Sequence, residues 1–210
     1  MSDTLHTQVI KVNGERYRIE LMHDCDPITP REWDNVAHFC FWHGRYNMAQ
    51  ELKQYTSAPE LKELRRAHPD AYIYPVYMYD HSNISLSLGR FGCRFDSGLL
   101  GFAIVDKSRA SDVFGITELT EERAREIVSD ELQEYEQYIN GEVYAVSIDK
   151  IQSVTHKIYA LNGELLREYD DVLAETVHIC SGLYSTDDII AEIHAETGAN
   201  IDDLKKEWSY

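Results

Sequence analysis

The chain has 210 residues, of which 43% are hydrophobic and 27% are charged, and its formal net charge is -17. This composition is that of an ordinary globular protein that is long enough to bury a core, and no apolar run approaches the roughly 20 residues that a membrane helix needs. The acidic excess argues against direct binding of nucleic acid, because phosphate backbones attract basic surfaces and repel acidic ones.

Length and composition also predict the organisation of the chain. We expect one globular domain over residues 1–210. The first residues, MSDTLHTQ, have neither the basic nor the apolar region of a signal peptide, which favours a cytoplasmic protein. The four cysteines are scattered without a C-x-x-C pair, so we expect reduced thiols and no cofactor.

The first elements along the chain are a hairpin and a helix. An Asn-Gly dipeptide at 13–14 separates two alternating segments, 8–12 and 16–22, and this is a strong signal for a β-hairpin. A threonine, a proline and a glutamate within residues 29–32 then have the spacing of a helix cap. The apolar residues that follow predict a helix that continues to about Gly44 and is buried on a broad face.

The middle of the chain contains the strongest strand signals. After a short helix at 58–68, three apolar or alternating segments, 72–78, 84–88 and 99–105, predict the central strands of a sheet. A threonine cap and a long apolar stripe predict a helix over 120–139. We expect this helix to pack on the sheet in one core, formed by Leu86, Leu88, Leu100, Phe102, Ile104, Ile127, Val128 and Leu132.

The last part of the chain returns to strands and ends in helices. A strand at 143–148 is followed by a second Asn-Gly hairpin around 162–163 and by a strand at 177–184. A capped helix then runs to about residue 197, and 200–208 adds a last turn or two. These elements predict an α+β fold, with a mostly antiparallel sheet and helices packed on it.

Three stretches resemble an uncharacterised family of small proteins from bacteriophages and integrative or plasmid-type mobile elements. They are DPITPREWDNVAHFCFWHGRYNMAQ, YPVYMYDHSNISLSLGRFGCRFDSGLLGFAIV, and EYEQYINGEVYAV with the later HICSGLYS. The family pattern includes R-Y-N, Y-D-H-S-G and C-x-W-D-S-G, from which the chain departs at Asn83, in place of glycine, and Phe95, in place of tryptophan. The resemblance implies a genomic setting, and it gives no residue a catalytic role.

Four reactive side chains lie on the turns that join the predicted central strands. They are His81, Cys93, Asp96 and Ser97. In a hydrolase, Cys93 or Ser97 would be the nucleophile, His81 or His43 the base, and Asp96 or Asp34 the group that orients it. The alternative is an Asp-Ser-Gly turn beside a small core cysteine, and the chain has no G-x-S-x-G motif. We therefore assign no catalytic residue.

Two His-x-Cys pairs raise the question of a metal site. His38 and Cys40 fall within the predicted first helix, where residues two apart point to different faces, so they would be poor joint ligands. His178 and Cys180 fall within a predicted strand and share a face. Histidines and thiols with ordinary hydrogen bonds are the favoured interpretation, and no metal is expected.

The negative charge is concentrated in two segments. Residues 118–142 hold nine acidic and two basic side chains, and 164–207 hold twelve and three, whereas 1–117 is nearly neutral. Four carboxylates at i, i+4 spacing form a row on the predicted 120–139 helix: Glu122, Glu126, Asp130 and Glu134. Such a row can imitate a line of phosphates, or it can be an ordinary solvated helix face.

Charge and genomic setting together predict a function. Mobile elements carry accessory proteins that block restriction, CRISPR or other host defences, so we expect an inhibitor or modulator that binds a host protein at a basic nucleic-acid-binding surface. The four carboxylates are the expected contact residues. The alternatives are a small Cys/Ser-His hydrolase and a structural module without catalytic activity.

Overall fold

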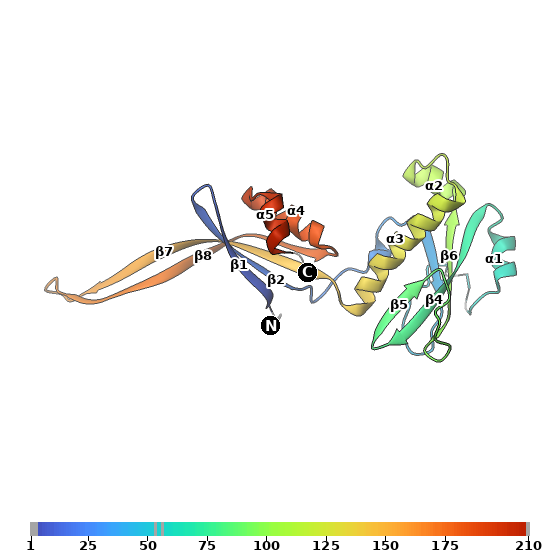
Figure 1. Cartoon of the computed structure of the whole chain (residues 1–210), viewed down its shortest axis with the longest axis horizontal. Coiled ribbons are helices and arrows are strands. Elements are labelled where there is room, and N and C mark those ends of the chain that lie inside the picture. Colours follow the sequence, from blue (N-terminus) through green and yellow to red (C-terminus); the bar gives the residue numbers. More distant parts are fainter. Residues whose placement is uncertain (1–3, 53, 56, 209–210) are drawn as a thin grey trace. The chain divides into compact units, whose positions relative to one another are not determined.

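The computed structural model describes residues 4–52, 54–55 and 57–208. Within them the chain forms eight strands in two antiparallel sheets, together with five α-helices, and this confirms the predicted α+β class. One compact unit comprises the residues up to Pro27 and those from Gly141 onward, and the other comprises Ile28–Asn140 (Figure 1). The expectation of a single domain over 1–210 stays a prediction.

The first unit contains a sheet of strand order β1-β2-β7-β8. Its opening hairpin pairs β1 (Thr4–Val12) with β2 (Glu15–His23), as predicted. Asn13 and Gly14 both have positive φ angles, 50° and 88°. These angles suit a tight two-residue turn that follows the twist of the strands, which explains why Asn-Gly predicted the hairpin.

The second hairpin of this unit is longer than predicted. Strand β7 (Tyr144–Tyr159) pairs with β8 (Leu165–Leu183) around the expected Asn-Gly turn, and each is one continuous strand with local bulges. The pairing of β7 with β2 ends at Ile151, so residues 152–173 continue as a two-stranded ribbon that Figure 1 shows extending past β1 and β2.

Two C-terminal helices cover one face of this sheet. Helix α4 (Thr186–Thr197) is capped by Ser185, one of two residues, with Thr186, that the sequence offers as a cap, and α5 (Ile201–Glu207) follows with Asn200 as its cap. Their apolar side chains pack onto the central strands (Figure 1). The buried core of the unit consists of Ile19, Leu21, Val146, Ile148, Leu183, Ile189, Ile190, Ile193, Ala199, Leu204 and Trp208.

The second unit is built on the predicted central strands. Strands β4 (Ala71–His81), β5 (Asn83–Ser87) and β6 (Ser97–Asp106) form an antiparallel sheet with β3 (Ala37–Phe41) in the order β3-β6-β4-β5. Strand β6 is buried on both faces, which explains its uninterrupted apolar sequence.

The predicted helix after residue 29 is wrong. Thr29 and Pro30 do start a turn, but the 3-10 turn η1 ends at Glu32 and the chain then enters strand β3. Alternate residues of β3 face two different cores: Phe39 packs beneath α3, whereas Cys40 faces the opposite side of the sheet. A strand buried on both faces is apolar all round, and its sequence therefore imitates a buried helix.

Helix α3 (Glu121–Asn140) packs on one face of the sheet, as predicted (Figure 1). Val128 and Leu132 share a core with Leu100 of β6 and with Leu86 and Leu88 at its edge. The expected single core is wrong for three residues. Phe102 and Ile104 lie on the opposite face of β6, in a cluster with Leu64 of α1 (Leu61–Ala67), and Ile127 is half-buried outside the core beneath α3.

One helix of the second unit was not predicted. Helix α2 (Lys107–Phe114) occupies the polar connection after β6 and begins at Asp106, whose carboxylate accepts hydrogen bonds from the amides of Ser108 and Arg109. Only Ala110 of this helix is buried, so its sequence lacks a strong apolar stripe. None of the helices in the described ranges combines the length and the apolar content needed to cross a membrane.

Candidate functional site

The structure brings together three of the side chains proposed for a hydrolase. The carboxylate of Asp96 lies 3.4 Å from Cys93 Sγ and 3.8 Å from His81 Nδ1. Ser97 directs its hydroxyl to the backbone carbonyl of Cys93, as in a side-chain-supported turn. His81 ends β4, and Cys93 and Asp96 lie on the connection between β5 and β6. The pairing of β6 with β4, which continues in a hydrogen bond from the Asp80 amide to the Asp96 carbonyl, holds them together.

A second polar group lies next to Asp96. Asp80 accepts hydrogen bonds from Arg45 Nη2 at 2.5 Å and from the Tyr46 hydroxyl at 3.1 Å. The ring of His43 stacks on Tyr46 with 4.9 Å between the ring centroids. His43, Asp80 and Asp96 line one hollow of about 280 Å³. Asp34 is exposed on the segment before β3 and does not line this hollow.

The order of the three groups differs from that of a catalytic triad. A nucleophile must contact its base, and the base must contact the group that orients it. Here the carboxylate of Asp96 lies between the thiol of Cys93 and the imidazole of His81, and it accepts the hydrogen bond from the thiol. The His81 side chain is 68% exposed, so little of the site excludes water. These residues therefore stay candidates of the alternative hydrolase, with no catalytic role assigned.

The acidic row of α3 lies on the side opposite the core. Glu122, Glu126 and Asp130 are exposed, whereas Glu134 is half-buried and takes part in other interactions. Glu126 also forms an ion pair with Arg123 at 3.0 Å, which neutralises part of its charge. Three of the four predicted contact residues are therefore available to a partner as a row, with about 6 Å of helix rise between successive members.

The helix that carries this row is fixed to the sheet by polar contacts as well as by its apolar stripe. The edge strand β5 donates its Leu86 amide to the Glu136 carboxylate at 2.5 Å. On the same strand, the Ile84 amide donates to Asn140 Oδ1 at 2.9 Å, and Asn140 Nδ2 donates to the Ile84 carbonyl at 2.8 Å. The Tyr135 hydroxyl accepts the Ala49 amide at 3.0 Å. These contacts cover an unpaired sheet edge and hold α3 in place.

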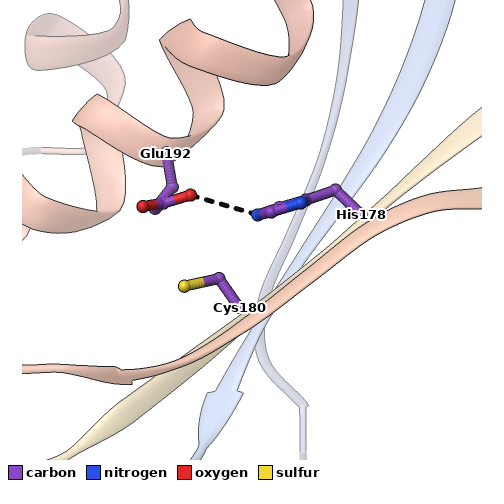
Figure 2. A group of neighbouring side chains, drawn as sticks. All are labelled: His178, Cys180 and Glu192. Carbon is purple, nitrogen blue, oxygen red and sulfur yellow. Dashed lines mark hydrogen bonds and ion pairs between the residues drawn. The ribbon is translucent and has the colours of Figure 1, made fainter.

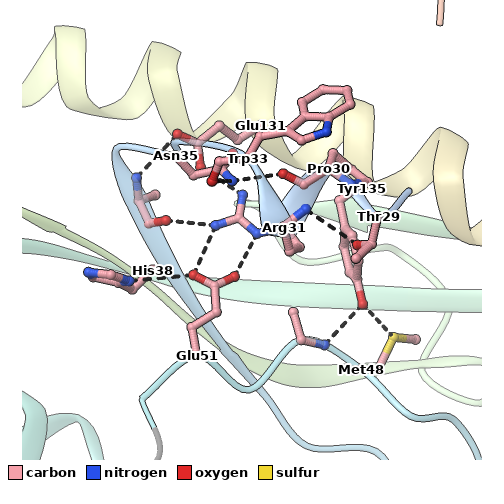
Figure 3. A network of polar contacts seen from close by, with 12 residues as sticks. Thr29, Pro30, Arg31, Trp33, Asn35, His38, Met48, Glu51, Glu131 and Tyr135 are labelled. Carbon is pink, nitrogen blue, oxygen red and sulfur yellow. Dashed lines mark hydrogen bonds and ion pairs between the residues drawn. The ribbon is translucent and has the colours of Figure 1, made fainter. Parts of the chain in front are cut away.

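Figure 3 shows a buried ion network next to α3 that the sequence did not predict. The guanidinium of Arg31, which is 6% exposed, donates to Glu51 at 2.6 Å and to Glu131 at 2.8 Å. It also donates to the Ala37 carbonyl at 2.7 Å and lies 3.8 Å above the ring of Phe39. The other oxygen of Glu131 accepts two backbone amides at the start of β3.

One signal in the sequence pointed to this network. Glu131 lies in the apolar stripe of α3, between Val128 and Tyr135, where a charged side chain requires a buried partner. The partner itself lies 100 residues away, and no local pattern identifies it. A hollow of about 520 Å³ borders the network and is lined by Arg31, His38 and Tyr135, among others. The donors of Arg31 are already used within the fold, which indicates a structural role.

The first His-x-Cys pair lies on a strand instead of a helix. His38 and Cys40 are on β3 and therefore share a face, so the reason given for excluding them as joint ligands was wrong. His38 Nδ1 lies 3.4 Å from Glu51. Burial raises the pKa of the Cys40 thiol to about 11, only partly offset by backbone hydrogen bonds. Within the described residues, this pair belongs to no group of three ligand atoms close enough to share a metal ion.

The comparisons with known proteins add no assignment. No family model, no curated protein and no solved structure matches this chain. The resemblance to the mobile-element family therefore remains an expectation that depends on the motifs alone.

Proposed function

We propose that this protein is an acidic accessory protein that binds a host protein at a basic nucleic-acid-binding surface and so inhibits or modulates it. The observation that carries the proposal is the exposed row of carboxylates on α3, formed by Glu122, Glu126 and Asp130. Glu134, the fourth expected member, contributes less because it is half-buried.

The fixed position of α3 supports this proposal. A flexible acidic segment loses conformational entropy when it binds, whereas a helix held by its core and by the contacts to β5 presents its charges already in place. The row projects away from that core, so a partner can reach it without unfolding the unit. Attraction between such a row and a basic surface acts over several ångströms and accelerates association.

The proposal is tested by capture from a host lysate with three forms of the immobilised protein. The triple variant Glu122→Gln, Glu126→Gln, Asp130→Asn removes the exposed row. A matched control, Asp70→Asn, Asp112→Asn, Glu118→Gln, removes three exposed carboxylates of the same unit that lie outside α3. We expect the parent and the control to retain a nucleic-acid-binding protein that duplex DNA elutes, and the triple variant to retain little of it.

Two results would contradict the proposal. One is retention of the same protein by the triple variant and the parent alike. The other is a captured protein that duplex DNA does not release. If this protein occupies the nucleic-acid-binding surface of its partner, duplex DNA must compete with it for that surface. Circular dichroism of each variant confirms that the fold is intact.

The proximity of Cys93, Asp96 and His81 favours a hydrolase as the second candidate function. Its test uses a thiol-directed reagent and a panel of ester and amide substrates. A hydrolase of this kind would lose its activity in Cys93→Ala, and alkylation of the thiol would be faster in the parent than in His81→Ala. If Cys93→Ala shows no less hydrolysis than the parent and His81→Ala is alkylated as fast as the parent, the group is only a supported turn.

A further inference from the structure

The second His-x-Cys pair lies next to a carboxylate from another element (Figure 2). His178 and Cys180 are two residues apart on β8 and so project from the same face of the sheet. Glu192 lies on α4, which packs over that face. One ligand atom from each of the three residues lies within 4.8 Å of the others, and all three side chains are half-buried.

A fourth side chain orients the imidazole. His178 Nε2 lies 3.1 Å from the Glu192 carboxylate, and Nδ1 lies 3.4 Å from the carboxylate of Glu196, one turn later on α4. A proton on Nδ1 can thus be donated to Glu196, which leaves Nε2 as a lone-pair donor that faces Cys180 and Glu192. Histidines that bind metals commonly hold their second nitrogen against a carboxylate in this way.

The surrounding fold holds the two sides of this group at a fixed separation. On the strand side, Val146 pairs with Cys180 and Ile148 pairs with His178. On the helix side, Ile189 and Ile193 flank Glu192 and are buried in the core of the unit. Zinc holds its ligand atoms at roughly 2.0–2.3 Å, so binding must draw these three side chains, whose ligand atoms lie within 4.8 Å of one another, closer together.

We propose that His178 Nε2, Cys180 Sγ and the Glu192 carboxylate bind Zn²⁺, with a fourth position open to water and with Glu196 as a positioning residue. The donor set selects the metal: thiolate and imidazole together favour zinc over Mg²⁺ or Ca²⁺, which prefer oxygen ligands alone. Binding displaces the thiol proton of Cys180 to solvent. The sequence showed the His-x-Cys pair, but not that α4 places Glu192 beside it.

The test uses the full chain without an affinity tag, freed of metal by chelation and kept reduced. Titration with Zn²⁺ should show one site and raise the melting temperature, since the assembled site exists only in the folded protein. Titration with Co²⁺ should produce the visible absorption of a tetrahedral site and the near-ultraviolet band of a thiolate-to-cobalt charge transfer. Cys180→Ser should abolish the charge-transfer band.

Further variants distinguish the metal ligands from residues that do not bind the metal. Cys25→Ser, at an exposed cysteine of the same unit, should leave the spectrum and affinity unchanged. Glu196→Gln should keep the cobalt spectrum while weakening zinc about 10- to 100-fold. The proposal is overturned if the reduced parent does not bind zinc at one equivalent, or if Cys180→Ser and His178→Ala, folded by circular dichroism, bind it as tightly as the parent.

Discussion

Gly101 shows how a single residue fixes the approach of two strands. It lies opposite Phe41 in the pairing of β6 with β3, and a Cβ atom at this position would be 2.0 Å from the carbonyl oxygen of Cys40. The obstructing atom belongs to the backbone, so side-chain rotation cannot relieve the clash. We expect Gly101→Ala to lower the free energy of unfolding by about 3 kcal/mol, as measured by denaturant titration.

Gly98 provides the matched control, because it lies on the same strand and a Cβ atom there meets no neighbouring atom within 4 Å. Gly98→Ala should change the free energy of unfolding by less than about 1 kcal/mol. Similar losses in the two variants would show that the close approach of β3 and β6 is not what requires glycine at 101.

The Arg31 network predicts a dependence of stability on pH. Burial alone would raise the pKa of the Glu51 carboxyl, but hydrogen bonds from His38 and Arg31 outweigh it, and the pKa lies below its ordinary value of 4.5. A carboxyl whose pKa is lower in the folded state stabilises the fold above its unfolded pKa, and this contribution disappears as the pH falls through the folded value.

Glu51→Gln should therefore destabilise the second unit by about 2 kcal/mol at neutral pH, and by progressively less below about pH 5. Unfolding measured across a pH series checks this expectation. The control is Glu118→Gln, which removes an exposed carboxylate from the same unit and should leave the pH profile as in the parent. A constant difference between Glu51→Gln and the parent at all pH values would contradict this role of the Glu51 charge.

At the scale of the element, the ribbon of β7 and β8 is the part of the first unit that contributes least to its core. None of its residues belongs to the buried cluster beneath α4. Its large apolar side chains are exposed, among them Ile158, Tyr159, Leu165, Leu166, Tyr169, Val172 and Leu173. A two-stranded ribbon has little stability of its own, so its stability depends on the sheet from which it extends.

Replacement of residues 154–171 by Asn-Gly tests this view, because Ser153 and Val172 are paired and a two-residue turn can join them. The shortened chain should keep the helix content and the cooperative unfolding of the parent, with a free energy of unfolding within about 1 kcal/mol. A molten or aggregated product would mean that the ribbon is needed to form the sheet.

Local signals predicted most of the elements, and the exceptions have physical causes. Both Asn-Gly hairpins and the capped helices α3 and α4 depend on residues close in sequence, so they could be found from it. Strand β3 could not, because its two buried faces remove the alternation that identifies a strand. The candidate sites were predicted in part: the turn at 93–97 is local, whereas Arg31 with Glu131, and His178 with Glu192, meet only through tertiary packing.

At the scale of the molecule, the negative charge does not belong to one structural half. The acidic segment 118–142 falls almost entirely in the second unit, whereas 164–207 falls in the first. The proposed function is therefore restricted to the row on α3, which a single unit presents. Two acidic groups of the first unit, Glu192 and Glu196, belong to the proposed zinc site.

The most direct test of the proposed function is a competition on the captured partner. A labelled DNA duplex is bound to the partner, the protein is added, and fluorescence anisotropy reports how much duplex is displaced. The parent and the Asp70, Asp112, Glu118 control should displace the duplex equally well at one fixed salt concentration. The Glu122, Glu126, Asp130 variant should require a concentration at least about tenfold higher than that of the parent to displace half of the duplex. Equal displacement by that variant and the parent would contradict the account.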